Sequence, residues 1–114
     1  MENKRRHKRV PISATATLTS LEKDDRQSMQ TMVADISFGG IGVYSDDTLP
    51  TDTQVSIMIT FISTDGLMRS DSIEGHIVYD RKMGNFYFIG IKFQDELSSE
   101  SQPSLYKHIQ HSLK

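Results

Sequence analysis

Hydrophobic and polar residues alternate along most of the chain, and this period of two is typical of a β-strand with one buried face. In residues 10–19, proline, serine or threonine occupies every second position, and Pro11 marks the start or an edge of the strand. The other strand-like runs are residues 29–36, 40–44, 55–61, 68–81 and 86–93. The pattern therefore predicts a succession of short strands.

Short polar links separate these runs. Residues 37–40, with the sequence Ser-Phe-Gly-Gly, are typical of a hairpin turn or bulge because glycine tolerates positive φ. Residues 64–66 and 82–85 also have turn chemistry. Because the links are short and no helix intervenes, we expect an all-β antiparallel barrel or sandwich.

The alternation also predicts which side chains are buried. Tyr79 is two residues from Ile77 in a continuous run, so we expect the two side chains to share the face that also carries Ile73. The aromatic residues of 86–93 are expected to fill the barrel core.

Only the C-terminal end changes period. Leu105, Ile109 and Leu113 recur every four residues after Pro103, as in an amphipathic helix. We expect one α-helix over about residues 99–112, packed across an open end of the barrel.

The size of the chain fits one domain. Its 114 residues would comprise a basic N-terminal arm (residues 1–9), a barrel (residues 10–94) and the helix. With 36% hydrophobic and 25% charged residues, the composition is that of a globular protein. No cysteine is present, and the longest apolar run, residues 57–62, is too short to span a bilayer. We therefore expect a cytoplasmic protein that does not insert into a membrane.

Charge is unevenly distributed between the arm and the rest of the chain. The arm has five Lys or Arg residues and one Glu, which gives +4, so the net charge of −2 leaves −6 for residues 10–114. A protein that binds nucleic acid over a broad face needs many phosphate contacts along a positive surface. The arm alone is better suited to one small anion.

Two arginines of the arm have a suggestive spacing. Arg5 and Arg9 are four residues apart and lead directly into a strand, so both guanidinium groups can reach one ligand. Arginine can bind a phosphate through two hydrogen bonds, stack on a purine or contact the O6/N7 edge of guanine. The arm would suit a guanine nucleotide, although a basic terminus can also be a solvated tail.

The stretch Asp35-Ile-Ser-Phe-Gly-Gly40 also allows two interpretations. In the simpler one, Asp35 and Ser37 cap a turn whose glycines permit the geometry. In the other, the turn exposes a carboxylate, a hydroxyl and closely approachable backbone to the N–H groups of guanine and to phosphate oxygens. The stretch is not a Rossmann or P-loop motif, because it lacks the Lys-Ser/Thr pair and a following helix.

Together, Arg5-x-x-x-Arg9 and Asp35-x-Ser37-x-x-Gly40 resemble the paired signature of the PilZ domain, a bacterial receptor for cyclic di-GMP. Four further segments sit where that family's pattern expects them, so the resemblance extends from Arg5 to the C-terminal helix. These segments are Val10-Pro11, Ile41-Gly42-Val43, residues 75–78 and residues 88–93.

The resemblance implies a six-stranded antiparallel β-barrel with a C-terminal helix and a flexible basic arm. It also implies that Arg5 and Arg9 bind the guanine bases and phosphates of the dinucleotide. Asp35 and Ser37 would hydrogen-bond the ligand, and Gly40 would keep the turn tight beneath it.

Two further arm residues are auxiliary candidates. Lys4 precedes the first motif arginine, at a position that in this family is relevant to whether one or two nucleotide molecules bind, and a basic residue there favours two. Arg6 adds charge at a position that the pattern leaves free.

The resulting hypothesis is a cyclic di-GMP receptor that orders its arm on the ligand and signals through an effector protein. One alternative is a PilZ-like module that binds proteins and no nucleotide. Another is a small nucleic-acid-binding barrel, which the acidic charge outside the arm disfavours.

Catalytic and metal sites are not expected from this sequence. No nucleophile lies beside a candidate base, so we do not expect an enzyme. His108 and His111 are three residues apart on the predicted helix, but no carboxylate accompanies them at ligand spacing. We therefore expect neither a metal nor a cofactor other than the nucleotide ligand.

Overall fold

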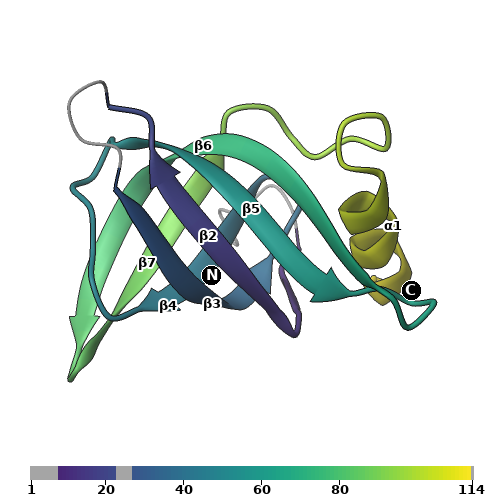
Figure 1. Ribbon diagram of the computed structural model, residues 1–114, viewed down its shortest axis with the longest axis horizontal. Helices are drawn as coiled ribbons and strands as arrows, with labels where there is room; N and C mark the ends of the chain where they lie inside the picture. The colour runs from purple at the N-terminus through teal and green to yellow at the C-terminus, as the bar shows by residue number, and fades with distance from the viewer. Residues whose placement is uncertain (1–7, 23–26, 114) are drawn as a thin grey trace, which may run out of the picture.

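A computed structural model describes residues 8–22 and 27–113. It contains mostly strands, with a single helix near the C-terminus (Figure 1). The elements are β1 (Val10–Pro11), β2 (Ala14–Ser20), β3 (Ser28–Ile36), β4 (Gly40–Ser45), β5 (Gln54–Ile62), β6 (Met68–Met83), β7 (Phe86–Phe93) and α1 (Pro103–Ser112).

Six of the strands close into an antiparallel barrel. Their order around the barrel is β2-β3-β4-β7-β6-β5, and β5 pairs with β2 to complete the ring. The short β1 pairs with β3 beyond the end of β2. The predicted six-stranded antiparallel barrel with a C-terminal helix is therefore confirmed.

The first predicted strand is interrupted. Val10 pairs with Ile36 and Thr15 pairs with Met32, so five steps along this part of the chain match four steps along β3. The surplus residue falls around Ile12, between β1 and β2. Residues 10–19 therefore form two strand segments along the same edge of β3, instead of one continuous strand.

The barrel interior is filled by aliphatic side chains, as the alternation predicted. Inward positions on β2, β5 and β7 are fully or almost fully buried, and removal of their apolar surface from water is the main contribution to stability. Examples are Ala16, Leu18, Ile57, Ile59, Ile89 and Ile91.

A bulge changes the predicted position of Tyr79. Ile77 pairs with Ile91 and Tyr79 pairs with Gly90, so Val78 is an extra residue in β6. The extra residue reverses the alternation after Ile77. The prediction that Tyr79 shares the buried face of Ile77 is therefore wrong: the Tyr79 ring lies over Gly90, an outward position of β7.

The aromatic residues of β7 are also divided between the two faces. Phe93 is buried and Tyr87 packs against the core, whereas Phe86 is 38% exposed and Phe88 contacts other rings outside the core. Because Ile89 points inward, its neighbour Phe88 must point outward. The prediction that the aromatics of this strand fill the core is wrong for Phe86 and Phe88.

The helix lies at one end of the barrel (Figure 1). It begins at Pro103 instead of near residue 99, because residues 99–102 form turns and proline is favoured in the first helical turn. Its buried residues are Leu105 and Ile109. In the described part of the chain, no helix is long and apolar enough to cross a membrane.

One helical side chain is held against the end of β5. The ring centroids of His108 and Phe61 are 5.2 Å apart in an edge-on arrangement. Burial lowers the pKa of His108 below its usual value, and the charge of His111 lowers it further. Both effects favour the neutral form of the imidazole that packs against Phe61.

The start of the helix is capped by a neighbouring strand. Gln102 precedes the helix but its side chain makes no capping hydrogen bond. Instead, the Leu105 N–H donates to Asp71 Oδ2 of β6 at 2.7 Å, and Gln102 Nε2 donates to the Ser72 carbonyl at 3.1 Å. These two bonds tie the helix to β6.

Replacing Asp71 with alanine should therefore lower the free energy of unfolding by about 1 kcal/mol, the usual loss for a helix cap. Urea unfolding followed by circular dichroism measures this change. Asp71→Asn retains a side-chain oxygen that can accept the bond, so it should lose less. Equal stability of Asp71→Ala and wild type would contradict the capping role.

Candidate functional site

The candidate site begins at a bulge in β3. Val33 pairs with Val43 and Asp35 pairs with Gly42, so Ala34 has no counterpart in β4. Val33 and Ile36 are both buried, whereas Ala34 and Asp35 between them are only partly buried. The bulge therefore turns the Asp35 carboxylate to the outer surface of the barrel wall.

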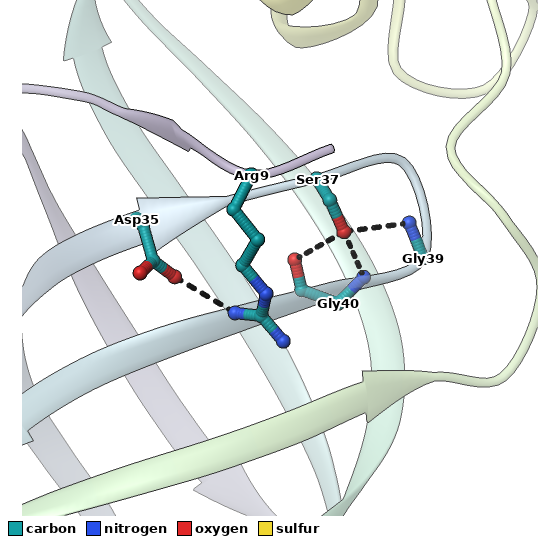
Figure 2. A network of polar contacts seen from close by, with 5 residues as sticks. All are labelled: Arg9, Asp35, Ser37, Gly39 and Gly40. Atoms are coloured by element: carbon teal, nitrogen blue, oxygen red, sulfur yellow. Dashed lines mark hydrogen bonds and ion pairs between the residues drawn. The ribbon is translucent and has the colours of Figure 1, made fainter. Parts of the chain in front are cut away.

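Arg9 meets this carboxylate because of strand pairing. Pro11 pairs with Asp35, so the residue that leads into β1 lies beside the bulge. Arg9 Nη1 donates to Asp35 Oδ1 at 2.8 Å (Figure 2). The Arg9 and Asp35 side chains are 18% and 34% exposed, so this charge-assisted bond is only partly screened by water.

The Arg9 guanidinium keeps unused donors. Its Nε is buried and has no hydrogen-bond partner among the described residues. A buried N–H without an acceptor is costly, and an acceptor from outside the chain reaches this one only when the atoms that cover it move. Arg9 therefore combines a fixed position with a remaining capacity to bind an anion.

Gly40 allows the backbone to come close to this guanidinium. A Cβ atom at position 40 would lie 2.7 Å from the Ile91 carbonyl oxygen and 3.6 Å from Arg9 Nη2. The first distance is shorter than real side chains tolerate. Gly40 is thus required for strand pairing and also leaves open space beside Arg9.

Ser37 organises the turn between β3 and β4. Ser37 is only 4% exposed. Its Oγ accepts hydrogen bonds from the N–H groups of Gly39 and Gly40, both at 3.2 Å (Figure 2). The Ser37 N–H donates to the Gly40 carbonyl at 2.9 Å. These bonds assign Ser37 a turn-holding role, and its contact with a ligand stays a prediction.

The same turn is connected to the C-terminal segment. The Phe38 ring lies 4.9 Å from the Tyr106 ring of α1. The Leu97 N–H donates to the Phe38 carbonyl and the Phe93 N–H donates to the Gly39 carbonyl, both at 2.9 Å. A displacement of the turn would therefore act directly on the helix.

An aromatic cluster borders the site, and sequence analysis missed it. A Cβ atom at Gly42 would lie 2.8 Å from Phe88 Cζ and 3.1 Å from Asp35 Oδ1, so the ring and the carboxylate are close neighbours. The centroid of the Phe88 ring also lies 5.2 Å from that of Tyr44 and 5.9 Å from that of Tyr79. Strict alternation from Ile89 and Ile91 would have placed Phe88 outside.

The fold thus brings together four of the predicted site residues: Arg9, Asp35, Ser37 and Gly40. Lys4, Arg5 and Arg6 lie outside the described residues. Within residues 8–22 and 27–113, no group of three or more His, Asp or Glu side chains could hold a metal ion.

Comparison with known proteins shows the family of this chain. The family model described as PilZ domain matches residues 3–112, which include both motifs and the helix. The chain belongs to the PilZ domain family. No curated protein sequence matches this PilZ domain.

Two solved structures share the fold of this PilZ domain. The Bacillus subtilis inhibitor of motility, MotI/DgrA, has a TM-score of 0.75 at 16% identity, over 98% of this chain and 53% of that chain. This PilZ domain therefore spans about half of the B. subtilis protein. The PilZ domain of YcgR from Escherichia coli, solved with c-di-GMP, has a TM-score of 0.64 at 18% identity, over 97% of this chain and 92% of that chain.

The turn-holding role of Ser37 can be measured without a ligand. Ser37→Ala leaves the N–H groups of Gly39 and Gly40 without their acceptor, so the free energy of unfolding should fall by about 1–3 kcal/mol. Ser56→Ala is a matched control, because Ser56 lies on a strand and its side chain makes no hydrogen bond in the described structure. Equal stability of the two variants in urea unfolding would contradict this role.

Proposed function

We propose that this PilZ domain binds cyclic di-GMP on the outer barrel surface formed by Arg9, Asp35 and the turn at residues 37–40. The observation that carries the proposal is the Arg9 guanidinium, which is held by Asp35 while its buried Nε has no partner. A nucleotide supplies acceptors of the kind that this group lacks. The E. coli neighbour was solved with c-di-GMP, which supports the same class of ligand here.

The chemistry of the two charged groups suits a guanine nucleotide. Arg9 can donate to a phosphate oxygen or to the O6/N7 edge of guanine with the N–H groups that Asp35 does not use. Asp35 is an acceptor-only group, and its Oδ2 can accept from the N1–H and N2–H of a guanine base. The pair would therefore recognise both parts of the ligand.

The N-terminal arm would complete this site. We propose that Arg5 and the auxiliary residues Lys4 and Arg6 contact the ligand from the side opposite the barrel. Arg5 precedes Arg9 by four residues, a separation short enough for both side chains to reach one dinucleotide. Contacts with the ligand would then offset the entropy lost when the arm is fixed.

The liganded domain would signal through an effector protein. The contacts of Phe38 with Tyr106 and of its carbonyl with the Leu97 N–H support a route from the turn to the helix. The B. subtilis neighbour is an inhibitor of motility, which supports a regulatory role for domains of this fold. PilZ domains are ligand-binding and adaptor domains, and we propose the same non-enzymatic role in the cytoplasm for this chain.

A second candidate is a protein-interaction module that does not bind the nucleotide. The Arg9–Asp35 pair favours it in one respect, because each charge already has a partner of opposite sign. The two candidates differ in whether the remaining donors of Arg9 are used by a ligand. Calorimetric titration distinguishes them.

Titration of cyclic di-GMP into the wild-type chain should give binding in the micromolar range or tighter. Arg9→Ala and Asp35→Ala should each weaken binding by about tenfold or more, because a hydrogen bond to a charged group contributes about 1.5–3 kcal/mol. Arg5→Ala should have an effect of similar size. The readouts are the dissociation constant and the stoichiometry, and two molecules per chain would support the assignment of Lys4.

Lys8→Ala is the matched control, because it removes an exposed positive charge next to Arg9 without removing a motif residue. It should change the affinity only slightly. No heat of binding with the wild type would favour the module that binds only proteins. If Lys8→Ala and Arg9→Ala weaken the affinity for cyclic di-GMP equally, the arm contributes only nonspecific positive charge and the assignment of Arg9 is contradicted.

A further inference from the structure

A patch on one face of the barrel carries no charge. Residues 15–19, 28–32 and 56–62 lie side by side on β2, β3 and β5 and contain no Asp, Glu, Lys or Arg, although 25% of the chain is charged. The outward positions of the adjoining residues 68–72 of β6 are also uncharged, and the next outward residue, the exposed Glu74 beside Ser56, marks the edge of this patch. We call the outward side chains of these four segments the neutral face.

The polar atoms of the neutral face are largely bonded to each other. The Thr17 hydroxyl donates to Gln30 Oε1 at 3.1 Å, and similar bonds join Thr19 to Ser28 and Thr60 to Ser70 across neighbouring strands. Covering polar groups that already have partners costs little, because few bonds to water are lost. The neutral face can therefore be buried against another surface more readily than a charged one.

Long apolar side chains project from the same face. Met32 is 67% exposed, Met58 is 45% exposed and Met68 is 71% exposed, and Ile62 beside Met68 is also exposed. Exposed methionines adapt their shape to a contacting surface and are enriched at binding surfaces. Single exposed apolar residues are ordinary, but these four lie together on a face without charge.

We propose that a second copy of this chain docks on the neutral face. Residues 10–114 carry a net charge of −6, so two copies repel one another where their acidic surfaces meet. Two neutral faces can meet without this repulsion. Charge compatibility thus favours face-to-face association of like copies, which is the usual isologous arrangement of a homodimer.

Strand register specifies which residues would meet. Thr17 lies between Gln30 of β3 and Met58 of β5, and Thr15 lies between Met32 and Thr60. A two-fold axis along β2 exchanges the β3 and β5 sides. Each Thr17 then faces Thr17 of the second copy, and each long Met32 faces the shorter Thr60.

The size of the neutral face predicts a weak dimer. The four segments hold 22 residues, and each residue covers about 4.8 by 3.3 Å of the sheet, which gives roughly 350 Å² per copy. The pair would bury about 700 Å², well below the roughly 1,200–2,000 Å² of stable complexes. We therefore expect a reversible dimer with a dissociation constant on the order of 10–100 µM or weaker.

Sedimentation velocity of the full chain from about 10 µM to about 1 mM tests this proposal. The wild type should shift from monomer towards dimer as concentration rises. Thr17→Lys and Thr17→Glu should each remain monomeric, because like charges would face each other across the axis. An equimolar mixture of the two variants should form dimers again, because the substituted positions then carry opposite charges.

Gln110→Lys and Gln110→Glu place the same charges on the exposed side of α1 and should dimerise like the wild type. Met58→Lys, at a separate exposed position of the neutral face, should be monomeric, and thermal unfolding verifies that each variant is folded. A wild type that is monomeric at every concentration would overturn the proposal, and any partner of the neutral face would then be a different protein. Variants at Thr17 that dimerise individually would also overturn it.

The neutral face shares no residue with the candidate nucleotide site. Dimerisation without added cyclic di-GMP would therefore support this proposal regardless of the calorimetric result. A failure to dimerise would leave the proposed nucleotide site unaffected.

Discussion

Ala34 has no partner residue in β4, and this surplus residue decides on which side of the barrel wall Asp35 lies. Without it, alternation from the buried Val33 would direct Asp35 into the apolar interior, where an unpaired carboxylate is very costly. With it, Asp35 reaches the outer surface and Ile36 returns to the core. The position of Arg9 beside Asp35, and with it the candidate site, depends on this single bulge.

The site built on the bulge combines rigidity with unused bonding capacity. Asp35 fixes one end of the Arg9 guanidinium, while Ser37 fixes the turn that continues from β3. Such preorganisation reduces the entropy cost of binding, because the receptor groups are already ordered. The contact of Phe38 with Tyr106 also joins this turn to α1, so the turn and the helix are linked by packed side chains.

The succession of strands along the chain, the turn at residues 37–40 and the helix after Pro103 could be predicted from the sequence, because each depends on local periodicity or turn chemistry. The order of the strands around the barrel depends on pairing between distant segments and could not be predicted in this way. The proximity of Arg9 and Asp35 followed from the two motifs. The outward positions of Tyr79 and Phe88 were missed for different reasons. The position of Tyr79 depends on the bulge at Val78, which only the pairing of β6 with β7 reveals. The position of Phe88 follows from strict alternation with Ile89, but the prediction instead followed the general tendency of aromatic side chains to be buried. The capping of α1 by Asp71 joins residues 34 positions apart, a separation that local patterns cannot reveal.

Arg9 holds Asp35 with one part of its guanidinium, and in the proposed complex the rest of the guanidinium contacts the nucleotide. Proton–nitrogen NMR of the arginine side chains, recorded during addition of cyclic di-GMP, tests this most directly. The Arg9 Nε–H signal should shift and exchange more slowly with water at saturation, while that of the exposed Arg81 should stay unchanged. An Arg9 signal that does not respond to saturating nucleotide would contradict the account.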